Sequence, residues 1–154
     1  MPIIGLNINK ISAERKENAF LGKGLEIKTQ PQITDVRETK LEGLSKENID
    51  ILSIGFAMSS TFNPDAGSIL IEGSILYKSD KKDAILKEWK KAKALPSEDG
   101  VIVLNHIFNK ASIIGLYLAD LLSLPPIISL PRVEPRRDYD KTSQSVTPTQ
   151  EKKN

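Results

Sequence analysis

Apolar and polar residues alternate through the first half of the chain, as in strands with one buried face. In the segment from residue 2 to 15, the apolar residues hold even positions before Asn9 and odd positions after Lys10: Ile4, Leu6, Ile8, Ile11 and Ala13. Because neighbouring side chains of a strand point to opposite faces, the change of parity predicts a β-bulge at Asn9–Lys10.

Two later segments carry the strongest alternation, at residues 49–62 and 68–78. The turn sequence Asn63-Pro-Asp-Ala-Gly67 separates them. Its proline fixes φ, its aspartate can bond its own backbone, and its glycine can supply a positive φ. The two segments therefore predict an antiparallel hairpin.

A weaker strand is predicted over residues 25–39, where Pro31 and several polar residues dilute the apolar positions. Since proline cannot donate to a sheet ladder, this segment is expected at a sheet edge. The polar stretches 16–23 and 42–47 are expected to be connections.

Helical spacing replaces the alternation after residue 79. A first helix is predicted to about Ala94, capped by Ser79 or Asp80, with apolar residues at Ile85, Leu86, Trp89, Ala92 and Leu95. Leu95-Pro96 ends it. A second helix is predicted from a Ser97 cap to about Leu122, with carboxylates in its first turn.

Four strands followed by two helices predict an α+β fold with a four-stranded antiparallel sheet. Residues 1–133 form the expected domain. Residues 134–154 are rich in Thr, Ser, Gln, Pro and charge, and we expect them to be a disordered polar tail.

The segment Val101–Arg132 stands out because its helix is apolar nearly all round and runs into an apolar stretch punctuated by prolines. Such a helix must be covered on every side, and a chain of this size has few elements to cover it. Two interpretations of residues 124–131 stay open. The segment packs within its own domain, or it contacts another copy of the chain or a client polypeptide.

Bulk composition narrows the function classes. The chain has 154 residues, no cysteine and a net charge of +2, all of which comes from residues 132–154. The absence of cysteine excludes thiolate metal sites and fits a reducing, cytoplasmic location. Lys110, Asp120 and the prolines interrupt the apolar run, so no membrane span is expected.

Catalytic chemistry finds little support. His106 is the single histidine, and its place in the apolar helix favours a structural role. A general base needs a positioned partner and a pocket, and the sequence offers neither. We expect no enzyme activity, no cofactor and no metal.

An alternative function is a ribosome- or RNA-associated binding protein. Six lysines crowd the first helix beside Trp89, and the tail adds further basic residues: Lys81, Lys82, Lys87, Lys90, Lys91, Lys93, Arg132, Arg136, Arg137, Lys152 and Lys153. Such residues can contact phosphates. Because acidic residues are interleaved and Trp89 lies on the apolar side, a solvated amphipathic face is the favoured interpretation.

Four segments together resemble the SecB-like chaperone family, and its archaeal branch more than the bacterial export chaperone. They are Ile8-Asn-Lys-Ile-Ser-Ala-Glu-Arg15, Ile69-Leu-Ile-Glu-Gly-Ser-Ile-Leu-Tyr77, Leu104-Asn-His-Ile107 and Leu124-Pro-Pro-Ile-Ile-Ser-Leu-Pro131. The resemblance spans roughly residues 3–133.

The resemblance implies an ATP-independent holdase that binds unfolded or nascent polypeptides and assembles as a dimer or tetramer through its sheets and long helix. Carried over by element, the client groove would be lined by Phe56, Met58, Phe62, Leu116, Tyr117, Leu121, Ile127, Ile128 and Leu130. The lysine-rich helix has no counterpart in the bacterial export chaperone, and the acidic surface for docking an export motor is not evident. A role in protein export is therefore implied only by the resemblance, and these two departures count against it.

Overall fold

The computed structural model describes residues 2–17, 25–40, 50–129 and 131 of the chain. Its elements, in chain order, are β1 Ile3–Arg15, β2 Glu26–Lys40, β3 Asp50–Asn63, β4 Gly67–Tyr77, α1 Lys82–Ala92 and α2 Ser97–Leu121. These bounds confirm the α+β fold with a four-stranded antiparallel sheet followed by two helices. The expected tail, the whole expected connection 42–47 and residues 18–23 of the other connection lie outside the described residues.

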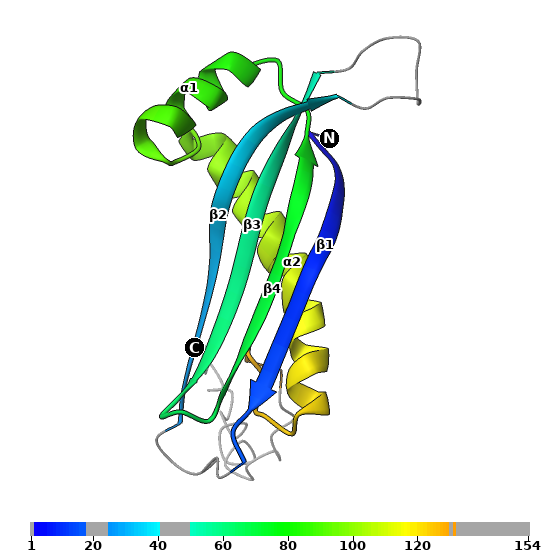
Figure 1. Ribbon diagram of the computed structural model, residues 1–154, viewed down its shortest axis with the longest axis vertical. Helices are drawn as coiled ribbons and strands as arrows, with labels where there is room; N and C mark the ends of the chain where they lie inside the picture. Colours follow the sequence, from blue (N-terminus) through cyan, green and yellow to red (C-terminus); the bar gives the residue numbers. More distant parts are fainter. Residues whose placement is uncertain (1, 18–24, 41–49, 130, 132–154) are drawn as a thin grey trace, which may run out of the picture.

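The sheet has the strand order β1-β4-β3-β2, with all neighbours antiparallel. β2, β3 and β4 pair consecutively, and β1 returns to lie beside β4, which is a Greek-key arrangement. β1 and β2 are the two edges (Figure 1). The edge position expected for the segment containing Pro31 is confirmed.

Bulges interrupt the pairing of both edge strands. The register of β1 against β4 shifts between Ile8 and Lys10, as predicted from the change of parity, and Asn9 is the extra residue. Shifts at Ile4 in β1 and Thr34 in β2 were not predicted. Each extra residue restores the alternation that keeps apolar side chains on one face.

The core lies between one face of this sheet and α2, which crosses it diagonally from the α1 end to the opposite end (Figure 1). Paired residues of β3 and β4 point into it together, such as Ile54 opposite Ile75 and Met58 opposite Ile71. Phe56 lies opposite Gly73, where a Cβ would approach the Phe56 ring to 2.9 Å. The glycine therefore makes room for the Phe56 ring within the core.

Both helices begin differently from the prediction. α1 begins at Lys82 and α2 at Ser97, and neither has a side-chain hydrogen bond at its N-cap. The Ser79 hydroxyl instead accepts from the Lys81 backbone N–H, before the helix starts. The expected caps at Ser79 or Asp80 and at Ser97 are wrong, because Ser97 already has helical geometry and Pro96 occupies the cap position. The carboxylates in the first turn of α2 are confirmed.

The turn between β3 and β4 is present as predicted, with one difference in detail. The positive φ belongs to Asp65, at 42°, rather than to Gly67. Aspartate tolerates this region better than most residues. Gly67 is needed for another reason, because a Cβ there would lie 2.4 Å from the Glu14 carbonyl oxygen of β1.

α2 ends in a Schellman motif. The Leu124 N–H donates to the Ala119 carbonyl oxygen at 2.8 Å, the Ser123 N–H donates to that of Asp120 at 3.0 Å, and Ser123 has a φ of 53°. Leu124 and Ala119 are both buried, which is the apolar contact that accompanies this motif. The chain is thereby turned back toward the sheet just before Pro125 and Pro126.

Candidate functional site

The side of α2 that faces the sheet is built from small and β-branched residues. Val103, Ile107, Ala111 and Ala119 are completely buried, and Gly115 is buried between the last two. Their four-residue spacing places them on successive turns of one face. Small residues at the last three positions let this half of the helix lie close to the sheet.

The opposite side of α2 carries large apolar residues that remain in solvent. Ile113, Tyr117 and Leu121 follow one another at four-residue spacing and are 67%, 63% and 61% exposed. Val101, Ile102 and Phe108 extend the exposed apolar surface toward the start of the helix. An exposed row of this kind on one helix face is typical of an interaction surface.

The segment after α2 forms a second apolar feature, which we call the proline groove. It has a volume of about 720 Å³, and no charged side chain lines it. Its lining residues are Ile27, Pro125, Pro126, Ile127, Ile128, Ser129 and Pro131. The groove lies between this segment and the beginning of edge strand β2.

Contacts with α2 hold the proline groove in place. A Cβ built on Gly115 would lie 2.4 Å from Cδ1 of Ile127 and 3.7 Å from Cε of Met58. The Ile127 side chain therefore packs directly onto the helix backbone at Gly115, which has no side chain of its own. Arg15, at the end of β1, donates from Nη1 to the Leu122 carbonyl oxygen at 3.2 Å and ties the helix end to the sheet.

The other end of α2 is tied to the sheet by a hydrogen bond from the Tyr77 hydroxyl to Asp99 Oδ1. Burial raises the pKa of Tyr77 above its ordinary value, and the bonded Asp99 carboxylate raises it further. The pair is structural, since it fixes the first turn of the helix at the C-terminal end of β4.

The structure divides the nine residues expected to line a client groove. Phe56, Met58 and Phe62 are buried in the core beneath α2, while Tyr117 and Leu121 point to solvent on its far side. Leu116 is half-buried, Ile127 and Ile128 line the proline groove, and Leu130 lies outside the described residues. Their role in binding a client stays a prediction.

On the edge strands, sequence reasoning missed apolar side chains that are exposed or that form the groove. Ile27 belongs to the diluted strand β2, yet it forms one wall of the proline groove. Ile11 of β1 is 48% exposed although it lies in register with the buried Ile71 of β4. The strand order could have identified both, but the alternation alone could not.

Metal binding needs clustered ligating side chains, and a membrane span needs a long apolar helix. Within the described ranges, no group of three or more His, Cys, Asp or Glu residues could hold a metal ion. α2 is long and apolar enough to cross a membrane by length and composition, with a mean hydropathy of 1.4. One such helix is weak support for a span, because a core helix that packs on a sheet passes the same test.

Comparison with known proteins adds a structural likeness. No family model and no curated protein matches the sequence. Among solved structures, the chain is similar to the SecB-like chaperone Rv1957 of Mycobacterium tuberculosis, in complex with a ChAD peptide from the antitoxin HigA1. The TM-score is 0.55 at 13% identity, covering 87% of this chain and 91% of that one. The fold is SecB-like.

Proposed function

We propose that this protein is an ATP-independent, non-enzymatic chaperone that holds unfolded or nascent polypeptides. The observation that carries the proposal is the combination of a SecB-like fold with apolar surface left open on α2 and in the proline groove. The similar chaperone binds a peptide, which supports polypeptide as the ligand class.

The chemistry of the proline groove suits an extended apolar segment. Its walls are aliphatic and proline side chains, and Ser129 is the only residue among them with a polar side chain. Pro125, Pro126 and Pro131 have no backbone N–H to donate to an added strand. The groove would therefore bind a client segment through apolar contacts rather than through a regular ladder of backbone hydrogen bonds. An unfolded chain offers such segments frequently.

We also propose that the protein forms a homodimer or homotetramer. Edge strand β2 is protected by Pro31, by the bulge at Thr34 and by α1. β1 runs for 13 residues without proline and pairs with β4 on one side only. The bulges of β1 lie at Ile4 and Asn9, and its stretch from Lys10 to Arg15 pairs regularly with β4. Since an edge strand without proline can pair with another chain, this stretch of β1 together with the exposed row of α2 is the expected contact between copies.

The cytoplasm is the proposed location, because the cysteine-free composition fits a reducing compartment. The similar chaperone is bacterial, so assignment to an archaeal branch remains a prediction from the four sequence segments. A role in protein export remains a prediction as well.

An aggregation assay with a chemically denatured client tests the proposed activity. Light scattering by the diluted client should be suppressed without nucleotide by the wild-type protein at several-fold excess. Ile128→Asp should weaken suppression, since it places a charge in the apolar groove. Ser123→Asp is the matched control, because it adds the same charge at an exposed polar position that does not line the groove.

Two results would contradict the proposal. One is a folded wild-type protein that gives no suppression at any ratio. The other is equal suppression by both aspartate variants, which would remove the proline groove as the binding site. Circular dichroism of each variant separates loss of binding from loss of fold.

A further inference from the structure

The lysines of α1 form a second exposed feature, which lies away from the apolar surfaces. α1 rests on β2 through its buried residues Ile85 and Trp89, while Lys82 bonds Glu38 near the end of that strand. Glu38 and Ile27 lie eleven residues apart along β2, or roughly 35 Å. α1 and the proline groove therefore occupy opposite ends of the molecule (Figure 1).

Three lysines on the outer side of α1 are neighbours, and none forms an ion pair with a carboxylate of the described residues. Lys90 and Lys91 follow Lys87 at three and four residues, which places their Cβ atoms about 5–6 Å apart on the helix surface. All three are exposed. Although Asp83 and Glu88 lie on the same helix, no ion pair joins Lys87, Lys90 or Lys91 to a carboxylate among the described residues. We call these three residues the lysine face.

The lysine face offers charge without an apolar anchor. Trp89 is buried, and the Lys93 ammonium lies 5.5 Å from the centroid of its ring. The exposed residues without charge on α1 are the alanines Ala84 and Ala92. Protein–protein contacts are usually anchored by aromatic or aliphatic side chains and are depleted in lysine. A phosphate backbone needs neither an anchor nor a shaped pocket, because its binding is driven by counterion release.

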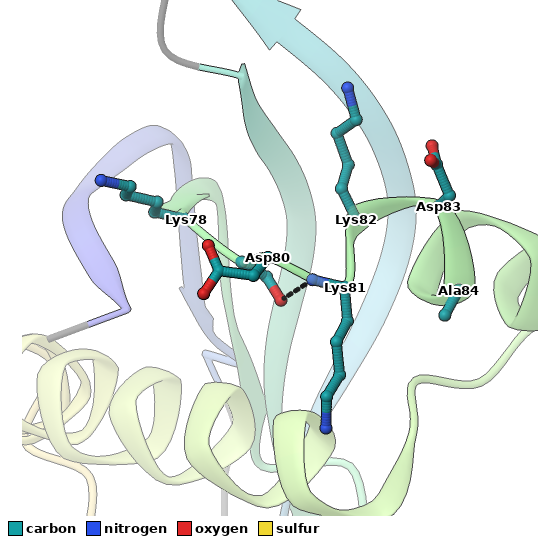
Figure 2. A pocket seen from close by; sticks show the side chains of 7 residues that line it. Lys78, Asp80, Lys81, Lys82, Asp83 and Ala84 are labelled. Atoms are coloured by element: carbon teal, nitrogen blue, oxygen red, sulfur yellow. Dashed lines mark hydrogen bonds between the residues drawn. The ribbon is translucent and has the colours of Figure 1, made fainter.

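The start of α1 is a poorer candidate for anion binding. Figure 2 shows that Lys78, Lys81 and Lys82 diverge around the open cavity that they line with Asp80 and Asp83. Ammonium groups that point apart cannot converge on a single phosphate. The lysine face instead presents a row of charges suited to a chain of phosphates.

We propose that the lysine face of α1 binds the phosphate backbone of a nucleic acid strand, weakly and without sequence preference. The contact uses lysine ammonium groups as point charges on phosphate oxygens. It does not rest on the proposed chaperone function, because α1 shares no residue with the proline groove. The full chain should therefore hold a client and a nucleic acid strand at the same time.

The test measures binding of fluorescent single-stranded RNA, and of DNA with the same sequence, to the full chain over a range of salt. The variant Lys87→Gln/Lys90→Gln/Lys91→Gln keeps helix propensity and removes three charges. The matched control Lys28→Gln/Lys40→Gln/Lys110→Gln removes three exposed charges elsewhere. The α1 variant should make the slope of log Kobs against log salt shallower by roughly 2, at about 0.7 for each lost contact. The control should leave most of the slope unchanged.

The outcomes separate clearly. Equal binding of RNA and DNA, lost in the α1 variant, supports a pure backbone contact, and lysine-dependent binding of RNA alone identifies RNA as the source of the phosphates. Unchanged affinity in the α1 variant, or an equal loss in the control, would overturn the proposal. So would lysine-dependent binding of a polyglutamate peptide in the absence of any nucleic acid binding. Aggregation suppression by the α1 variant should equal that of the wild type.

Discussion

The two sides of α2 both carry apolar residues, but one side is buried and the other is exposed. The side toward the sheet carries Ile107, Ala111 and Gly115, which are buried, and the side away from it carries Ile113 and Tyr117, which are mostly in solvent. The inner side is dominated by small residues in its second half, whereas the outer side is dominated by large ones. The inner side therefore determines how closely the helix approaches the sheet, while the outer side is available to a partner.

This difference shows why apolar content alone does not define a core. A helix that only needed to fold this domain could carry polar residues on its outer side. Keeping large apolar residues there exposes them to water and risks aggregation in an isolated chain. The proposed association between copies, or with a client, would offset that exposure, which would link the stability of the helix to the proposed function.

The largest expected contrast is between matched isoleucines on the two sides. Ile107→Ala should lower the free energy of unfolding by about 2–5 kcal/mol, because it leaves a cavity at a fully buried position. Ile113→Ala should change it by no more than about 0.5 kcal/mol in the monomer. Urea denaturation at low protein concentration measures both. Equal losses would mean that the outer side is buried within one chain.

A smaller effect is expected where the inner side meets the proline groove. Gly115→Val should cost about 1–3 kcal/mol, since its side chain would occupy the place of Ile127 Cδ1. Ile127→Ala in the same chain should recover part of this loss, because it removes the clashing atom. A double-mutant cycle from denaturation curves gives the coupling. Additive losses would show that the two residues do not touch in solution.

The hydrogen bond that fixes the start of α2 is expected to contribute less. Tyr77→Phe should lower stability by about 1–2 kcal/mol at neutral pH. The raised pKa of Tyr77 favours its protonated form in the folded state. That stabilisation is complete below the unfolded value near pH 10 and is lost as pH rises toward the folded value. Denaturation from pH 8 to 11 should therefore show a steeper loss for the wild type than for Tyr77→Phe, and parallel curves would contradict the assignment.

The smallest effect on folding and the largest on association should come from Leu121→Asp. The side chain is 61% exposed, so the monomer should lose about 0.5 kcal/mol or less. The mass measured by light scattering should fall from that of a dimer or tetramer to that of a monomer. Ala84→Asp adds the same charge at an exposed position of α1, away from the exposed row and from β1, and should retain the assembly. If the wild-type protein is itself a monomer, the exposed row does not mediate association between copies.

Local patterns were sufficient for the elements of this protein. Alternation located all four strands to within two residues, and the parity change predicted the bulge at Asn9. The predicted helix caps were wrong. Serine and aspartate are common N-cap residues, but here the backbone places Lys81 and Pro96 at the N-cap positions. Pairing between distant strands, as for Ile11 and Ile71, could not be inferred from local spacing.

The candidate surface was predictable only in part. The sequence indicated that α2 and the segment after it contain more apolar surface than one sheet can cover, and the exposed row agrees. It could not separate Phe56, Met58 and Phe62, which α2 covers, from Tyr117 and Leu121, which it does not. All five are apolar residues at regular spacing, and their exposure depends on the direction in which α2 crosses the sheet (Figure 1).

The amino-acid order by itself determined the elements, their sequence along the chain and the turn that returns the chain after α2, because these depend on interactions between near neighbours. The tertiary structure decided the strand order, the place of Ile27 in the proline groove and which side of α2 stays open. Those features depend on contacts between residues far apart in the chain, such as Ile127 on Gly115 and Arg15 on Leu122. The apolar periodicity of the sequence predicts which side chains are to be buried, whereas tertiary packing determines which residues bury them.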